Sequence, residues 1–88
     1  MKLTKILLGS LLATSVLAAP ALAAPKTADE YYKEGDTQYN LGDFDKAVDA
    51  FKQGFALETN DAKKPAYLYN IAQSYRQAGN CQQALFFY

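Results

Sequence analysis

The chain has 88 residues, enough for one small domain, and half of them are hydrophobic. Its 9 Lys and Arg residues balance its 9 Asp and Glu residues, so no basic excess points to nucleic acid. It contains no His and one Cys, Cys81, and these counts exclude most zinc sites and most Ser-His or Cys-His catalytic arrangements.

Residues 1–23 are predicted to be a secretory signal peptide. Lys2 and Lys5 provide a positive start, and the uncharged run Ile6–Ala19 follows. Pro20 breaks this run, and Ala21-Leu22-Ala23 supplies the small residues that signal peptidase requires. The run is shorter than the roughly 20 residues of a membrane span. An uncut membrane anchor is the alternative, but the Pro and the Ala-x-Ala ending favour cleavage.

We expect a soluble product that begins at Ala24 and is periplasmic or secreted from a bacterium, because no Cys follows the apolar run to carry a lipid. Loss of Lys2 and Lys5 leaves seven basic residues against nine acidic ones, a net charge of −2. No membrane insertion is expected after cleavage. Cys81 has no second Cys for an internal disulfide. It is predicted to be a small buried residue on the apolar side of a helix, with an intermolecular disulfide as the alternative.

Helical signals follow in chain order. Thr27 with Glu30 three residues later is a capping box. Apolar or small residues then recur at three- and four-residue steps, which predicts a helix that Gly42 stops: Ala28, Tyr31, Tyr32, Gly35 and Tyr39. Asp43 is predicted to cap a second helix. The apolar face of that helix comprises Phe44, Ala47, Val48, Phe51 and Phe55.

The polar stretch 58–64 is predicted to be a loop, and Pro65 suits the first turn of a third helix. The third helix is indicated by Leu68, Ile71, Ala72 and Tyr75. Gly79-Asn80 ends it, and a fourth helix begins with an apolar face made of Cys81, Ala84, Leu85 and Tyr88. Phe86 and Phe87 are predicted to lie off that face. No segment alternates as a strand would, so the predicted fold is all-α, with antiparallel helix hairpins joined by short turns.

The sequence repeats with a shift of 37 residues. Identical residues meet at Tyr32/Tyr69, Gly42/Gly79 and Ala47/Ala84, and similar ones meet at Gly35/Ala72, Thr37/Ser74, Asp43/Asn80, Val48/Leu85 and Phe51/Tyr88. The pattern resembles the tetratricopeptide repeat, whose period is about 34 residues. In the first unit Tyr31, Gly35, Ala47 and Phe51 match the family pattern, and in the second Leu68, Ile71, Ala72, Tyr75, Ala84 and Tyr88 do.

Several residues depart from the family pattern. Glu34 stands where an aliphatic residue is usual, Gln38 replaces a Tyr, and Thr59 replaces the closing Pro. The three extra residues of the period are placed in the loop 59–64. The resemblance implies an α-solenoid, with residues 28–61 as the first helix pair and residues 65–88 as an incomplete second pair. We therefore expect a chain truncated within its second repeat, whose exposed aromatic end invites self-association.

The resemblance also implies a protein or peptide partner, bound on the concave face that the first helix of each pair forms. The residues expected on this face are Tyr32, Asp36, Tyr39, Asn40, Tyr69, Gln73, Arg76 and Gln77. Tyr suits recognition because it combines a large contact area with a polar tip. The alternative for Tyr32 and Tyr69 is that they pack between neighbouring helices. Some family members clamp a terminal carboxylate here, but Asp36 would repel one.

No catalytic residues, cofactor or metal are predicted. Asp43-x-Asp45 resembles the start of a calcium loop, but Lys46 and Ala47 follow where further oxygen ligands should stand. The predicted function is thus a non-enzymatic, exported interaction scaffold. Two alternatives stay open: the N-terminal segment of a larger exported protein whose activity lies downstream, or a truncated remnant without function.

Overall fold

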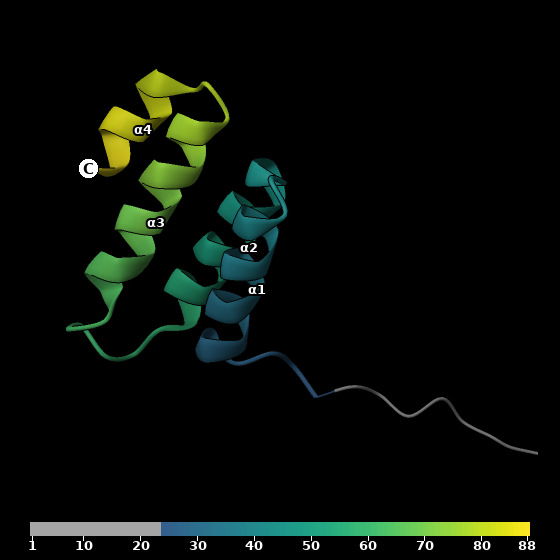
Figure 1. Ribbon diagram of the computed structural model, residues 1–88. Helices are drawn as coiled ribbons and strands as arrows, with labels where there is room; N and C mark the ends of the chain where they lie inside the picture. The colour runs from purple at the N-terminus through teal and green to yellow at the C-terminus, as the bar shows by residue number, and fades with distance from the viewer. Residues whose placement is uncertain (1–23) are drawn as a thin grey trace, which may run out of the picture.

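The computed structural model describes residues 24–88, and the predicted signal peptide, residues 1–23, lies outside them. The described part contains four helices and no strand: α1 (Ala28–Asn40), α2 (Phe44–Leu57), α3 (Lys64–Gln77) and α4 (Cys81–Phe87). They alternate in direction, so that each packs antiparallel to the next along the chain (Figure 1). None of these described helices has the length and apolar character needed to cross a membrane.

Local side chains set where the helices begin. The predicted capping box is present, because the Thr27 hydroxyl accepts the Glu30 N–H at 3.2 Å and the Glu30 carboxylate accepts the Thr27 N–H at 2.9 Å. Asp43 accepts the Lys46 N–H at the start of α2. The Asn80 side chain accepts the Gln83 N–H at the start of α4. Each bond satisfies a helical N–H that has no partner within its own helix.

The turns between paired helices depend on glycine. Gly42 and Gly79 have φ of 81° and 83°, the left-handed region in which a side chain is strained. The longer connection between α2 and α3 is polar, and Pro65 lies in the first turn of α3 as predicted. Lys64, which was expected in the loop, already belongs to α3.

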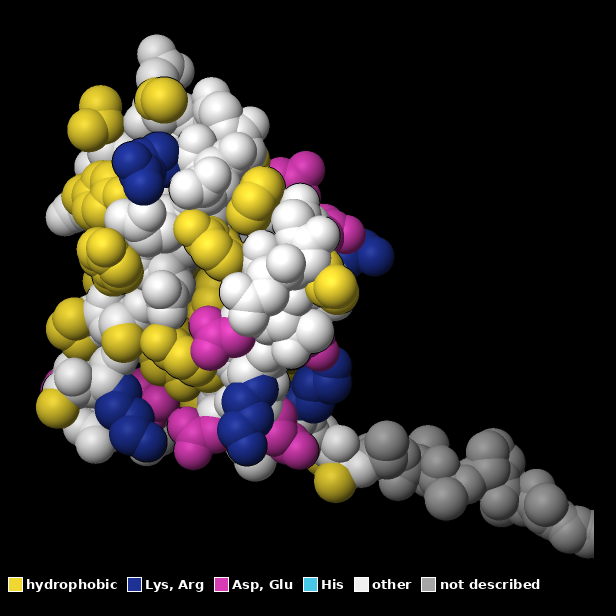
Figure 2. Space-filling view, in the orientation of Figure 1, with side chains coloured by type: hydrophobic (Ala, Val, Ile, Leu, Met, Phe, Trp, Pro, Cys, Tyr) yellow, Lys and Arg dark blue, Asp and Glu magenta, His cyan; other side chains and the backbone are white. Residues whose placement is uncertain are grey.

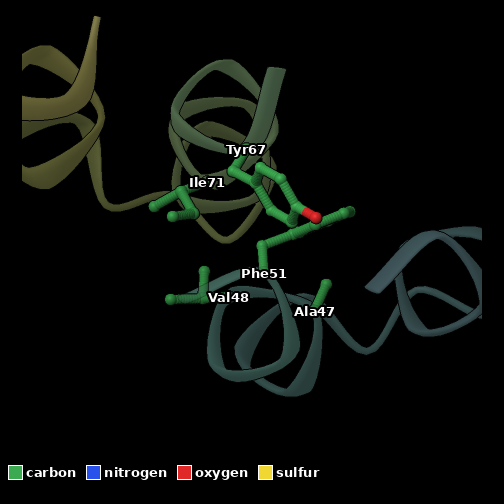
Figure 3. Close-up of a cluster of buried hydrophobic side chains, with 5 residues drawn as sticks. All are labelled: Ala47, Val48, Phe51, Tyr67 and Ile71. Atoms are coloured by element: carbon green, nitrogen blue, oxygen red, sulfur yellow. The ribbon is translucent and has the colours of Figure 1, made fainter. Parts of the chain in front are cut away.

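The core lies between α2 and α3. Five buried side chains form it: Ala47, Val48, Phe51, Tyr67 and Ile71. Figure 3 shows Tyr67 and Ile71 of α3 pointing toward Phe51 and Val48 of α2. Gly35 of α1 closes the other side of Phe51, since a Cβ built on Gly35 would lie 2.6 Å from the Phe51 ring.

The predicted faces of α4 are wrong at four residues, among them Tyr88, which was expected on the packed face and is 58% exposed. Cys81 is exposed rather than buried. Phe87, which was expected off the packed face, is half-buried against the core and stacks on Tyr75 with ring centroids 5.7 Å apart. Leu85, which was expected on the packed face, is 75% exposed. The reason is that α4 packs through Ala84 and Phe87, three residues apart, and this direction leaves Cys81 and Leu85 on its open side.

Candidate functional site

The face shared by α1 and α3 contains a pocket where the two helices meet the loop before α3. It has a volume of about 370 Å³ and is lined by Asp29, Tyr32, Ala62, Lys63, Ala66 and Tyr67. Figure 2 looks onto this face and shows hydrophobic side chains in the trough between α3 and the α1–α2 pair. Charged side chains of both signs gather along its lower edge.

Two tyrosine rings form the apolar wall of the pocket. Tyr32 of α1 meets Tyr67 of α3 edge to face, with centroids 5.1 Å apart and planes at 89°. Tyr32 also meets Phe51 edge to face, at 5.4 Å. Such pairs contribute about 0.5–1.5 kcal/mol beyond the area they bury. The wall is thus held rigidly from two sides and is preorganised for contact with an apolar group.

Hydrogen bonds hold both hydroxyl groups of this wall. The Asn70 side-chain N–H donates to the Tyr32 hydroxyl at 2.7 Å, and this bond ties α3 to α1. The Tyr67 hydroxyl donates to the Glu58 carboxylate at 2.8 Å. Burial, reinforced by that bond and by the negative charge of Glu58, raises the pKa of Tyr67 to about 12. Tyr67 therefore stays neutral at physiological pH.

The pKa of Glu58 shifts in the opposite direction to that of Tyr67. Its pKa is lowered, first by the backbone N–H of Asn60, which donates to it at 3.0 Å, and second by the Tyr67 hydroxyl. The charged carboxylate is thus fixed behind the pocket wall and positions the Tyr67 ring.

A charge pair lies at the rim of the pocket. Lys63 and Asp29 approach to 3.6 Å, and both side chains are more than half exposed. An exposed pair of this kind contributes little to stability, typically about 0–1 kcal/mol. Either charge can therefore exchange its partner for a charged group on a bound segment at small cost.

The sequence-predicted residues fall into two groups. From α1, Tyr32 lines the pocket, Tyr39 packs against Phe44 with centroids 5.3 Å apart, and Asp36 and Asn40 are exposed. The Tyr32 ring also packs between neighbouring helices, as the alternative interpretation expected.

The predicted residues of α3 are linked to one another and to the end of α4. The Gln73 side chain donates to the Tyr88 hydroxyl, and Arg76 donates to Gln73 at 3.2 Å. Tyr69 is 56% exposed and lies edge-on to Tyr88, with centroids 6.1 Å apart. Gln77 is exposed at the end of α3.

The predicted set missed most of the residues that line the pocket. Asp29 and Ala66 lie three residues before Tyr32 and Tyr69, on the same helical stripes, so extending each stripe by one turn would have found them. Tyr67 lies four residues before Ile71, which marks it as a core position. Lys63 has no comparable signal, because its place depends on how the loop folds.

The described residues offer no group of three or more His, Cys, Asp or Glu side chains that could hold a metal ion. The pocket wall is aromatic and neutral, and its charges lie at the rim. This arrangement suits contact with an apolar side chain and its polar surroundings.

Comparison with known proteins gives one match. Residues 28–61 match the tetratricopeptide repeat family, a segment that spans α1 and α2. No curated protein and no solved structure matches the chain. Repeats of this family generally mediate protein–protein interactions, and proteins that contain them are typically non-enzymatic scaffolds. The match covers the first helix pair, and the described part has four helices and no strand, as a fold built from such helical repeats would have.

Proposed function

We propose that the chain is an exported interaction scaffold that binds a peptide or protein segment on the face shared by α1 and α3. The observation that carries the proposal is the pocket that Asp29 and Tyr32 of α1 line together with Lys63 and Ala66, because it joins two helices of a repeat-like fold. An apolar side chain of the partner would enter this pocket, and the rim pair Asp29–Lys63 would contact its polar neighbours.

Amides along the same face extend the contact beyond the pocket. Gln73 is half-buried, and Asn40 and Gln77 are exposed. Each amide can both donate and accept hydrogen bonds, so together they suit the main chain of an extended segment. Asp36 adds a negative charge to the α1 side, whereas Arg76 adds a positive charge to the α3 side. A partner segment without a strong net charge fits this balance.

Selection from a random peptide library against the 88-residue chain tests this proposal. Ala66 is exposed and lines the pocket, so Ala66→Arg should fill it without disturbing the core. Ala56→Arg on α2, also exposed, is the matched control. We expect selected peptides to bind saturably, to lose about tenfold or more in affinity to Ala66→Arg, and to retain it with Ala56→Arg. Failure to enrich a saturable binder, or equal binding to both variants, would refute the proposal.

Export is supported by the layout of residues 1–23: a positive start, an apolar run and an Ala-x-Ala ending. Expression of the whole chain in a bacterial host, followed by fractionation and N-terminal sequencing, tests it. The expected product begins at Ala24 and is found outside the cytoplasm. A product that retains the residues before Ala24 and stays in the cytoplasm would contradict export.

A further inference from the structure

The pocket on the α1–α3 face separates its apolar surface from its charged groups. Tyr32, Ala62 and Ala66 supply the apolar surface. Asp29 and Lys63 lie at the rim with side chains that are 71% and 54% exposed, and Asp29 Oδ1 is 3.6 Å from Lys63 Nζ. A group that fills this pocket is therefore apolar within it and carries charge only at the mouth.

The charged side chains that act on the pocket wall are mostly negative. Burial, the hydrogen bond to Glu58 and the negative charges of Glu58 and Asp29 raise the pKa of Tyr67 to about 12, so both carboxylates act on this ring. The pKa of Glu58 is lowered mainly by hydrogen bonds from the Asn60 N–H and the Tyr67 hydroxyl, and the positive charge of Lys63 adds to this effect. A bound positive charge balances two carboxylates and one ammonium better than a negative charge does.

Asp29 can accept a cation from a ligand while it stays near Lys63. The carboxylate faces Lys63 through Oδ1, and an ionised carboxylate has about four acceptor positions on its two oxygens. Oδ2 can thus accept an ammonium, and the Lys63 ammonium, which has several N–H donors, can donate to a carbonyl. The rim therefore offers an acceptor for a cation and a donor for a carbonyl side by side.

We propose that this pocket recognises the free N-terminus of a partner protein whose first residue is apolar, an inference that rests on the proposed function. The first side chain occupies the pocket against Tyr32, the α-ammonium binds Asp29, and the first carbonyl accepts a hydrogen bond from Lys63. In an N-terminal residue the side chain, the ammonium and the carbonyl carbon are all attached to the same Cα. One residue therefore fills the pocket and reaches both charges of its rim.

Other charged ligands fit this arrangement less well. A Lys or Arg side chain in the pocket would carry its charge to the apolar interior instead of the mouth, and the loss of hydration is costly. A C-terminal carboxylate would meet the negative charges of Asp29 and Glu58 with Lys63 to attract it. An internal residue offers a neutral N–H in place of the ammonium, and a neutral donor binds a carboxylate less strongly than a charged one.

A random peptide library displayed with free N-termini tests the inference on the 88-residue chain. We expect the selected sequences to begin with an apolar residue. Each selected peptide is then synthesised in three forms: with a free N-terminus, with an acetylated N-terminus, and with one Gly added before its first residue. Acetylation removes the positive charge, and the added Gly moves it away from the apolar side chain. Each change should weaken binding, measured by fluorescence anisotropy, by about tenfold.

Two charge-matched variants of the chain locate the ammonium. Asp29→Asn removes the carboxylate at the mouth of the pocket, whereas Asp36→Asn removes an exposed one about two turns further along α1. Circular dichroism verifies that both variants fold. We expect Asp29→Asn to abolish the difference in affinity between the free and the acetylated peptide, and Asp36→Asn to leave that difference unchanged.

Three outcomes would overturn the inference. The first is a set of selected peptides that bind as tightly after acetylation or Gly addition; the proposed function survives this outcome when Ala66→Arg still weakens their binding. The second is a preference for the free N-terminus that is as large with Asp29→Asn as with Asp36→Asn. The third is the absence of any peptide whose binding Ala66→Arg weakens, which refutes the proposed function as well.

Discussion

Replacement of Gly35 by Ala tests the close approach of α1 to Phe51 of α2. A Cβ at this position would lie 2.6 Å from Cδ1 and Cε1 of Phe51 and 2.7 Å from its Cζ. Non-bonded carbon atoms are most favourable about 3.5–4.0 Å apart, so a shift is required. Phe51 is 1% exposed and is held edge-on by Tyr32, so its ring has no free space into which to move.

Two opposing effects set the size of the change. Overpacking of a filled core costs about 1–3 kcal/mol. Ala in place of Gly inside a helix returns up to about 1 kcal/mol. Since the clash involves a whole buried ring, the steric cost should exceed the gain, and we expect Gly35→Ala to lower the free energy of unfolding by about 1–2 kcal/mol. For a chain of this size each kcal/mol lowers Tm by about 4–8 °C.

Urea unfolding of the 88-residue chain, followed by far-ultraviolet circular dichroism, measures this effect. Asp36→Ala is the control, because it is the next residue of the same helix, is exposed, and gains helix propensity without a clash. It should leave stability unchanged or raise it slightly. A double-mutant cycle with Phe51→Leu should show positive coupling, since the smaller side chain relieves the clash. If Gly35→Ala is as stable as the unmodified chain, the packing argument is wrong.

Three further changes test other parts of the fold. Thr27→Ala removes the capping box shared with Glu30 and should cost about 1 kcal/mol of stability, measured by urea unfolding. Gly42→Ala should cost about 1–2 kcal/mol, because its φ is 81° although the space around it is open, and Gly42→Asn should cost less; equal losses for both would contradict the strain argument. The folded-state pKa of Tyr67, about 12, lies above its ordinary value of 10.0, so the stability it contributes is complete below pH 10 and is lost as pH rises toward 12. NMR titration of the Tyr67 ζ-carbon should show this pKa, and Glu58→Gln should move it toward 10.0; an unchanged value would remove Glu58 as a cause.

The helix starts and the turns could be predicted because their causes are local. A Thr with Glu three residues later identifies the start of α1, and Gly42 with Asp43 identifies the first turn. In each case one or two neighbouring residues satisfy the backbone groups, so no knowledge of distant packing is needed. The 37-residue repeat made the same turn recognisable at Gly79.

The packed side of α4 could not be predicted in the same way. A helix of seven residues makes about two turns, and this one has apolar residues on more than one side. Packing on other helices decides which side is buried, because Phe87 stacks on Tyr75 of α3. The Lys52 ammonium of α2 lies 5.4 Å from the centroid of the Tyr75 ring and 5.5 Å from that of the Phe87 ring. Lys52 also donates to the Tyr75 hydroxyl at 2.9 Å. This cluster joins residues from three helices, so the periodicity of apolar residues within α4 alone could not predict it.

The burial of the two aromatic pairs could not be predicted from the sequence either. The sequence repeat aligns Tyr32 with Tyr69 and Phe51 with Tyr88, which suggests equal roles. The structure makes the first pair a buried wall and the second an exposed one, because α3 covers the first pair and no described helix covers the second. Equivalent positions in a repeat therefore share geometry, whereas their burial depends on the element that packs over them.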